Sequence, residues 1–467
     1  MIKERLLKNM EKDKTHDRKD RGKKWVGTAA IILVFFLGFM VGDLSTSRNS
    51  VQATVAYSKL KVFGDVLSLI QSSYVEEVNM DNIVKGAIDG MVHSLDPHSS
   101  YLTPEMLKQV EVETKGVFGG LGIEIGVKDG VPTIIAPIED TPAAKAGLLA
   151  GDKIIRIEKE LTRNMTVMDA VKRLRGEPGT KVTITVSRES QPEPKVYTLT
   201  RELIRIKSVK PKQMSDGIGY IRLTQFQQDS HQEVERALNE FKKSKEGLKG
   251  LILDLRNNPG GLLDQAVRVA DAFIESGIIV YTDGRIEAQK TKYTAHKEGT
   301  WTGFPIVVMV NAGSASASEI VAGALQDHGR AIVIGQRTFG KASVQTILPM
   351  EDGSALRLTT ARYYTPNGRS IQARGIEPDI LVSDGREEST VFPTLREVDI
   401  ERHLRGENEE APSETPVPEV KGEKGKPKKT EPEVRREDQK DPQLDRAIEL
   451  LKGWEIFRTR FIENKAS

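Results

Sequence analysis

Cysteine is absent from this 467-residue chain. Its absence excludes disulfides, thiol catalysis, thiolate zinc sites and lipid attachment at cysteine. An excess of charge of either sign is also missing, because 69 Lys and Arg residues face 67 Asp and Glu residues, which leaves a net charge of +2. A chain so evenly balanced is not expected to bind nucleic acid through bulk positive charge. Its length is sufficient for two or three domains.

Long apolar runs are scarce, and the one that stands out lies near the amino terminus. Trp25–Gly42 reads WVGTAAIILVFFLGFMVG and carries no charge over 18 residues, about the minimum that crosses a bilayer. The basic residues 1–24 precede it, so we expect the amino terminus to stay inside and the remaining chain to be exported. The run is either an uncleaved membrane anchor, which its length favours, or a signal peptide cut after VQA at 51–53.

Residues 54–104 predict a helical region, and residues 204–385 predict an α/β domain. Apolar residues recur at helical spacing over 54–95, and the turn-rich LDPHSSYLTPE then interrupts the pattern. From 204 to 385, strand-like stretches such as GIGYIRL, GLILDL and PIVVMV alternate with helical ones. This alternation is typical of a mixed α/β fold. The helical segment 54–95 is also a candidate contact for a homodimer.

Two segments complete the chain toward its carboxyl end. Residues 406–440 contain five prolines, no aromatic residue and many mixed charges, which predicts a disordered linker. Residues 441–467 predict a helix, because Asp441 suits the cap and Pro442 suits the first helical position. We expect this helix to dock on the body or on a partner, and to carry no chemistry.

Residues 113–203, between the two larger regions, change to short strands and glycine turns. GGLGIEI resembles the carboxylate-binding loop and adjoining strand of a bacterial PDZ domain, and TPAAKAGLLAGDKII and DAVKRLRGEPGTKVTITVSR resemble the segments that follow it. Glycines let several backbone N–H groups converge on the terminal carboxylate of a peptide, and the peptide then extends the edge of the sheet. The resemblance assigns tail binding to Gly119, Gly120, Leu121, Gly122 and Ile123.

The stretch NAGSASASE, residues 311–319, places alternating serines between a strand-like run and a helix. Ser316 and Glu319 fit a capping box, which satisfies free N–H groups at the start of a helix. Alternatively, one of the serines is a nucleophile. His328 lies twelve residues beyond Ser316, roughly 18 Å along a helix and too far to accept its proton. A nucleophilic serine here therefore needs another base.

A second local signal, GQRTFGKA at 335–342, nearly matches a phosphate-binding loop. Ala342 stands where that loop requires a hydroxyl to ligate magnesium. The compartment implied by the amino-terminal run is also one in which nucleoside triphosphates are scarce. We therefore do not expect an enzyme that hydrolyses nucleotides.

Five separated motifs, in order, resemble the carboxyl-terminal processing proteases, also called tail-specific proteases. They are LDPHSSYLTPE, the PDZ segment, LILDLRNNPGGLLDQAV, VNAGSASASEIVAGALQDHGRAIVIGQRTFGKASVQT and YYTPNGRSIQARGIEPDI. The resemblance spans about residues 55–385 and implies an α/β catalytic body related to the crotonase-like proteins, with the PDZ domain inserted. It assigns the nucleophile to Ser316, the general base to Lys341 and the residue that assists the lysine to Gln345. Ala342 departs from the second glycine that is usual in the family.

A serine–lysine pair requires an uncharged amine. At neutral pH this means a lysine pKa of roughly 7 to 8 in place of the reference value of about 10.4. Desolvation in an apolar pocket lowers the pKa of a lysine in this way, and Phe339, Val344 and Ile347 flank Lys341 in the sequence. If the segment is helical, Gln345 shares a face with Lys341 and orients the amine without adding charge.

The tetrahedral intermediate of acyl transfer also needs hydrogen-bond donors. NNPGG at 257–261 follows a predicted strand and offers glycine N–H groups, so Gly260 or Gly261 is one candidate donor. The N–H of Ala317, directly after the nucleophile at a helix start, is the other. We expect Asp254 and Arg256 to support this loop rather than to react.

The resemblance implies a serine endopeptidase at a bacterial cytoplasmic (inner) membrane, with its catalytic part on the periplasmic or extracytoplasmic side. Its PDZ domain would capture protein substrates by carboxyl-terminal tails that end in small or apolar residues, and by family analogy would gate the site. Arg175, at the end of the groove helix, is either a relay for such gating or an ordinary surface arginine. No metal or organic cofactor is expected, and the sequence leaves open whether an adaptor protein takes part. The alternative is a catalytically silent PDZ scaffold that binds protein tails.

Overall fold

The computed structural model describes residues 58–163, 165–385, 395–406 and 441–458. The predicted basic segment 1–24, the anchor or signal segment 25–42 and all but the first residue of the linker 406–440 lie outside the described residues. Within the described ranges, no helix is long and apolar enough to cross a membrane. The chain divides into two compact units, one ending at Ala87 and the other beginning at Ile88.

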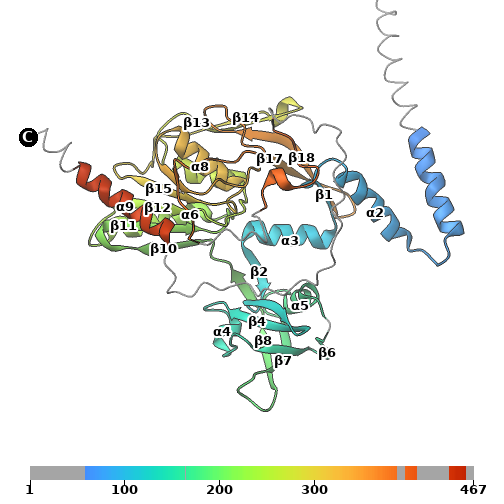
Figure 1. Ribbon diagram of the computed structural model, residues 1–467. Helices are drawn as coiled ribbons and strands as arrows, with labels where there is room; N and C mark the ends of the chain where they lie inside the picture. The colour runs from blue at the N-terminus through green and yellow to red at the C-terminus, as the bar shows by residue number, and fades with distance from the viewer. Residues whose placement is uncertain (1–57, 164, 386–394, 407–440, 459–467) are drawn as a thin grey trace, which may run out of the picture. The chain divides into compact units, whose positions relative to one another are not determined.

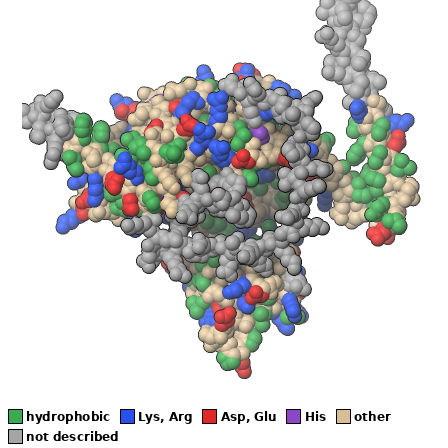
Figure 2. Space-filling model, in the orientation of Figure 1, with side chains coloured by type: hydrophobic (Ala, Val, Ile, Leu, Met, Phe, Trp, Pro, Cys, Tyr) green, Lys and Arg blue, Asp and Glu red, His purple; other side chains and the backbone are tan. Residues whose placement is uncertain are grey.

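The first unit is helical over residues 58–73, and a further helix, α2 (Met80–His93), begins at its end. Both helices lie within residues 54–95, for which the sequence predicts helices. The first of these helices (Figure 1) exposes large apolar side chains along one half of its surface, and polar residues occupy the other half (Figure 2). The apolar side chains are Leu60, Val62, Phe63, Val66 and Leu69, each roughly half exposed or more.

A six-stranded sheet forms the centre of the second unit, with the order β10-β11-β12-β15-β16-β19. β10 and β11 pair antiparallel, and every later pair is parallel. Strands and helices alternate along this part of the chain, as expected of a mixed α/β fold. The strands are β10 (Val209–Gln213), β11 (Ile218–Leu223), β12 (Gly250–Asp254), β15 (Ile306–Val310), β16 (Ile332–Gly335) and β19 (Ile380–Leu381).

Helices cover both faces of this sheet, which explains why its central strands β12 and β15 are buried along their whole length. Successive side chains of a strand point to opposite faces. Leu251 and Leu253 accordingly pack in one core with three helices, whereas Ile252 packs in another with Ala447 and Leu451 of α9. The helix expected at the carboxyl end therefore docks on the body (Figure 1). The helices are α6 (Ser230–Lys243), α7 (Leu263–Asp271) and α8 (Ala317–Asp327) on the first face and α9 (Pro442–Phe457) on the second.

A second, antiparallel sheet has the order β1-β18-β13-β14, and β17 also pairs with β18. Its β17 begins two residues after Lys341, so the segment that carries Gln345 is a strand and not a helix. The strands are β1 (Ser100–Leu102), β13 (Ile278–Gly284), β14 (Thr291–Thr294), β17 (Ser343–Pro349) and β18 (Ala355–Tyr364). Three short 3-10 helices complete the body, η1 (Ser215–Gly217), η2 (Glu287–Gln289) and η3 (Glu397–Asp399).

A separate β-rich domain is inserted between β1 and β10 and has its own apolar core. The helix α3 (Pro104–Lys115) precedes it, and its main sheet has the order β3-β4-β5-β7-β8, with β6 beside β5. A two-stranded ribbon of β2 and β9 forms its entry and exit. The elements are β2 (Val117–Gly120), β3 (Ile123–Lys128), β4 (Val131–Pro137), α4 (Pro142–Lys145), β5 (Lys153–Ile157), β6 (Glu160–Leu161), α5 (Val167–Leu174), β7 (Lys181–Ser187), β8 (Lys195–Thr200) and β9 (Glu202–Arg205).

Candidate active site

Three loops that follow β12, β15 and β16 form the candidate site. These strands are neighbours and parallel, so their carboxyl ends meet at one edge of the sheet. Asn257 and Asn311 exchange two hydrogen bonds of 2.9 Å between the first and second loops. The N–H of Phe339 donates to the carbonyl of Ser314 at 3.0 Å, which joins the third loop to the second. Sheet topology thus gathers the predicted glycines, serine and lysine.

Ser316 occupies a strained turn between β15 and α8. Its φ of +55° and ψ of −114° lie in a region that residues other than glycine seldom adopt. Gly260 lies against it so closely that a Cβ there would be 2.8 Å from the Cβ of Ser316. The Ser316 N–H donates to Glu319 at 2.8 Å, whereas the Ser316 side chain makes no cap hydrogen bond. The glutamate half of the predicted capping box is present, and the hydroxyl is not used as a cap.

Glu319 is a fully buried carboxylate that joins the serine turn to the lysine loop. Its Oε2 accepts the N–H groups of Ser316 and Lys341, at 2.8 and 2.9 Å. Its Oε1 accepts the Thr338 hydroxyl at 2.5 Å and the Gly340 N–H at 2.7 Å. Burial raises the pKa of Glu319 to about 7, against the lowering effect of these hydrogen bonds. One side chain therefore fixes the backbones of both predicted catalytic residues.

Lys341 lines a cleft of about 650 Å³ together with His98, Asn257, Ala315 and Phe339. Burial lowers the pKa of its amine below the ordinary value of a lysine. The carboxylates of Glu397, Asp96 and Glu319 act in the opposite direction, and the Arg357 guanidinium adds to the lowering. Among the apolar neighbours expected from the sequence, Phe339 lines the cleft, whereas Ile347 is exposed and does not wall it.

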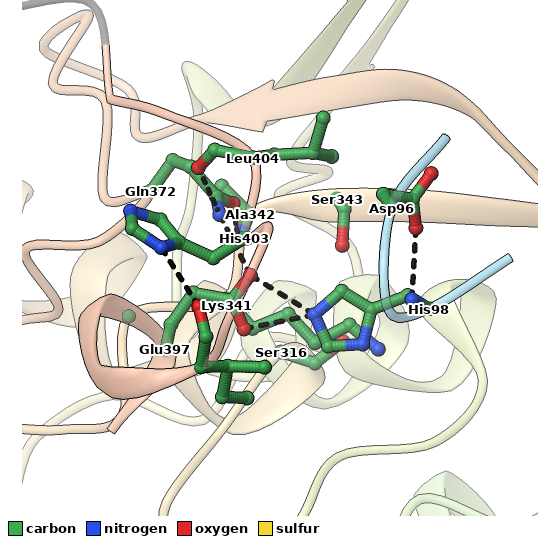
Figure 3. A network of polar contacts seen from close by, with 12 residues as sticks. Asp96, His98, Ser316, Lys341, Ala342, Ser343, Gln372, Glu397, His403 and Leu404 are labelled. Atoms are coloured by element: carbon green, nitrogen blue, oxygen red, sulfur yellow. Dashed lines mark hydrogen bonds and ion pairs between the residues drawn. The ribbon is translucent and has the colours of Figure 1, made fainter. Parts of the chain in front are cut away.

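Sequence reasoning missed two residues beside the lysine, His98 and Glu397 (Figure 3). His98 Nε2 lies 2.9 and 2.8 Å from the two carboxylate oxygens of Glu397, which is fully buried. The side chain of Asp96 accepts the backbone N–H of His98 at 2.8 Å. The side chain of Gln372 donates to Glu397 at 2.9 Å. The LDPHSS motif contained a signal for His98. No motif in the neighbouring sequence indicates a role for Glu397, which lies in η3, beyond the predicted end of the catalytic domain at 385.

Gln345 lies on β17, and its side chain contacts Ser343 and Thr359 rather than Lys341 as expected. Its Nε2 donates to Ser343 Oγ at 2.9 Å and to Thr359 Oγ1 at 3.3 Å. The Thr359 hydroxyl in turn donates to Asp96 at 3.2 Å. Gln345 is thereby linked to the turn that carries His98, and no described contact joins it to Lys341. Its role in orienting the amine stays a prediction.

The candidate oxyanion donors lie where the first loop meets the serine turn. The Gly260 N–H donates to Asn258 Oδ1 at 2.9 Å and is therefore occupied. No hydrogen bond of the Gly261 N–H or the Ala317 N–H is found within the described ranges. A Cβ on Gly260 would lie 3.0 Å from the Ala317 nitrogen, so glycine is required for this approach. Gly261 and Ala317 are accordingly the candidates whose N–H groups remain available.

The inserted domain has a narrow apolar groove between β3 and α5. Leu121, Ile123, Val171 and Leu174 line it, and β3 is the outermost strand of its sheet, as strand addition by a peptide requires. Gly122 has a φ of +75°, and a Cβ there would lie 2.3 Å from Thr141, so this position needs glycine. Gly119 and Gly120 instead lie in β2, paired with Leu203 and Glu202 of β9.

Arg175 and His328 are the two remaining residues that the sequence singled out. Arg175 is half-buried, its guanidinium lies 4.5 Å from the centre of the Phe118 ring, and it donates to Gln109 on α3. His328 caps the end of α8, where its Nε2 lies 2.8 Å from the Ile278 carbonyl. The loop after β16 leads into a strand, not into the helix that a phosphate-binding loop precedes. Within the described ranges, no group of three His, Asp or Glu side chains could hold a metal ion.

Three family models match the chain. Peptidase family S41 matches residues 217–382, a PDZ domain matches 109–187, and the Activating protease CtpB N-terminal domain matches 40–106. A carboxy-terminal-processing protease of Bartonella bacilliformis is 42% identical over 413 residues, which cover 88% of this chain and 91% of that protein. This chain belongs to the carboxy-terminal-processing proteases of peptidase family S41.

A second relative agrees with this assignment. A probable CtpA-like serine protease of Staphylococcus aureus (strain MRSA252) is 36% identical over 407 residues, covering 84% of this chain and 80% of that protein. A solved photosystem II D1 C-terminal processing protease is 31% identical, with a TM-score of 0.42, and covers 67% of this chain and 86% of its own. The predicted family is confirmed, and the chain is a serine peptidase, so the silent scaffold is not supported. Its PDZ domain implies that substrates bind through a carboxyl-terminal peptide.

Proposed function

We propose that this carboxy-terminal-processing protease is an exported, membrane-tethered endopeptidase that uses a Ser316–Lys341 dyad. The observation that carries the proposal is the shared anchor of the two residues. Their N–H groups donate to the same oxygen of Glu319, so the two backbones lie within a few ångströms of each other. Lys341 also lines the cleft beside the serine loop, and burial lowers its pKa. These are the conditions under which a lysine acts as a general base.

The reaction follows from this geometry. Neutral Lys341 Nζ takes the proton from Ser316 Oγ, which attacks the scissile carbonyl carbon. The N–H groups of Ala317 and of Gly260 or Gly261 stabilise the oxyanion, with Gly261 better available because Asn258 occupies the Gly260 N–H. The lysine ammonium then protonates the leaving amine. Water, deprotonated by the same lysine, releases the acyl group from the serine.

His98 is the second group in the cleft that could accept a proton. Glu397 holds its ring at Nε2, whereas the carboxylate of a catalytic triad holds the histidine at Nδ1 and leaves Nε2 facing the serine. We favour Lys341, because its backbone shares Glu319 with the serine and no such tie joins His98 to Ser316. The roles are separable, since replacing His98 by Gln keeps a polar side chain but removes the imidazole, which is the group that could accept the proton.

The PDZ groove would capture the substrate tail and signal to the cleft. Small or apolar carboxyl-terminal residues fit the apolar lining of the groove. Arg175 lines the same groove and contacts Gln109 on α3. α3 begins two residues after β1, which follows the turn that carries His98. A peptide that displaces Arg175 would thus act on an element directly connected to the cleft.

Membrane tethering and dimerisation are further parts of the proposal. Trp25–Gly42 would anchor the protein in the bacterial cytoplasmic membrane, with its catalytic part on the periplasmic or extracytoplasmic side. The exposed apolar side chains of residues 58–73 support a second copy of this chain as the partner of segment 54–95. An amphipathic helix buries its apolar face against another surface, and within the described residues this face is exposed.

The test compares cleavage with tail binding in full-length protein. Ser316→Ala should bind a peptide with an apolar carboxyl terminus as wild type does, but should not cleave it. Lys341→Ala and Lys341→Arg should both be inactive, because arginine cannot lose its proton. His98→Gln should retain activity. Cleavage by Ser316→Ala would eliminate the nucleophile, and an active Lys341→Ala beside an inactive His98→Gln would transfer the base to the histidine.

A further inference from the structure

Arg256 is a buried cation at the start of the glycine loop. It follows β12, precedes Asn257 and is only 4% exposed. Its guanidinium donates to Asp254 through Nε and Nη2, at 2.9 and 2.7 Å. It also donates to Asp441 through Nη1 and Nη2, at 2.8 and 2.9 Å. The second Nη1 donor reaches Gln443 at 3.0 Å, so all five N–H groups of the arginine have acceptors.

Two of these acceptors belong to the start of α9, far along the chain. Asp441 is the cap of α9 and also accepts the Leu444 N–H at 3.2 Å. Gln443 is 1% exposed and donates to the Val382 carbonyl at 2.8 Å, and it also lines the catalytic cleft. The carboxyl-terminal helix therefore does more than cover the sheet. Its first turn closes around the residue from which the glycine loop departs.

The loop beyond Arg256 is fixed against the serine turn by the residues that follow. Asn257 has a φ of +56°, a strained value for a residue other than glycine. The carbonyl of Asn258 accepts the Ala315 N–H at 3.0 Å and the Ser318 hydroxyl at 2.9 Å. Gly260 then lies against Ser316. A movement of Arg256 would consequently be transmitted to the donors that face the reacting carbonyl.

We propose that Arg256 and Asp441 are positioning residues, through which α9 sets the geometry of the oxyanion loop. The inference rests on the proposed function, because it assigns the loop to the same reaction. Neither residue touches the substrate. The hydrogen-bonded pair instead determines whether the loop presents its N–H groups at the distance that oxyanion stabilisation requires. A buried guanidinium that loses one carboxylate would pull the loop toward a new partner, and a displacement of about 1 Å can cost roughly a hundredfold in rate.

A purely structural role for this contact predicts something different. It would lower stability and leave the turnover of the folded protein unchanged. α9 provides a matched control for that case, since Lys452 forms a second ion pair with the body, to Asp216 at 2.8 Å. Asp216 precedes β11 and so lies at the opposite end of the strands from the loops. Lys452 and Asp216 are both about half exposed, so the loss of this ion pair should change stability and turnover little.

The experiment measures kcat and KM of full-length Asp441→Asn, Arg256→Lys and Lys452→Ala on a fluorogenic peptide with an apolar carboxyl terminus. We expect kcat of the first two to fall about tenfold or more, with KM and tail-peptide affinity within twofold of wild type. A peptide boronate, whose adduct with serine carries the oxyanion, should bind them more weakly by a similar factor. Asp441→Glu should recover part of the rate, whereas Lys452→Ala should match wild type.

Melting temperatures of the same variants separate positioning from folding. Should Asp441→Asn not fold, Gln443→Met makes the same comparison, because it removes the adjacent acceptor of Arg256. An Asp441→Asn protein that folds and turns over at the wild-type rate overturns the inference, as does an equal loss of kcat in Lys452→Ala. If wild-type protein shows no cleavage that depends on Ser316, the proposed function fails and the inference fails with it.

Discussion

Ser316 and Lys341 are both held in states that an isolated residue would avoid. A non-glycine residue in the φ region of Ser316 costs of the order of 1–3 kcal/mol, and Lys341 is desolvated beside three carboxylates. Glu319 offsets part of the strain at Ser316 by accepting its N–H, and it holds the Lys341 backbone in place through the Lys341 N–H. Every donor around Glu319 points at a carboxylate oxygen. The Thr338 hydroxyl is fixed as a donor, because it accepts the Ile376 N–H at 2.7 Å.

The lowered pKa of Lys341 predicts that activity and folding stability rise together with pH, whereas removing the lysine lowers activity and raises stability. Activity should rise with pH through the folded-state pKa of the lysine, which burial sets below its ordinary value. Between that pKa and about 10.4, the unfolded chain holds a proton that the folded chain does not, so folding stability is lost as pH falls. Lys341→Met should therefore be inactive yet more stable at neutral pH, by roughly 1 kcal/mol. Urea unfolding at two pH values measures this, and a less stable Lys341→Met would contradict it.

At the scale of elements, the proposed catalytic residues lie on loops and the proposed tail site lies at the edge of a sheet. The three loops of the candidate site meet because β12, β15 and β16 are adjacent parallel strands. The tail groove exists because α5 packs beside β3, the outermost strand of the PDZ sheet. A loop at the end of a buried strand is held on one side by the core. An edge strand keeps free hydrogen-bonding groups for a peptide.

A charge in the groove should separate tail capture from chemistry. Val171 lines the groove and the neighbouring Lys172 is exposed. Val171→Asp should weaken binding of an apolar tail peptide at least tenfold, because it places a carboxylate where an apolar side chain and a terminal carboxylate must lie. Lys172→Ala should bind as wild type does. Fluorescence polarisation with a labelled tail peptide measures both, and equal affinities would show that the tail binds elsewhere.

At the scale of the whole molecule, an unusual surface belongs to residues 58–73. Leu60, Phe63 and Val66 follow one another at intervals of three on one side of the helix, and Val62 and Leu69 lie beside Val66 and extend the same face. Single exposed apolar residues are ordinary, whereas a continuous patch indicates an interaction site. A second copy of the chain is the occupant that we propose.

Phe63→Ser should weaken this association. The substitution removes the largest apolar side chain of the patch, so the dimer should dissociate at least tenfold more readily, while each copy keeps its own fold. Lys61→Ser, on the opposite side of the same exposed helix, is the matched control and should leave association unchanged. Sedimentation velocity across a range of protein concentrations provides the measurement. A wild-type protein that stays monomeric would exclude segment 54–95 as a dimer contact.

The sequence by itself determined the family, the α/β body and the inserted PDZ domain, because each rests on local spacing and on motifs of contiguous residues. It also nominated Ser316 and Lys341 through such motifs. Tertiary structure alone decided what surrounds them. No local sequence feature indicates the roles of Glu397 and Asp441. Gln345 would share a face with Lys341 only if the segment were helical, and it lies instead on a strand that pairs with β18. Hydrogen bonds such as that from Arg256 to Asp441 join residues 185 positions apart, and only the folded chain determines which distant groups come within reach of one another.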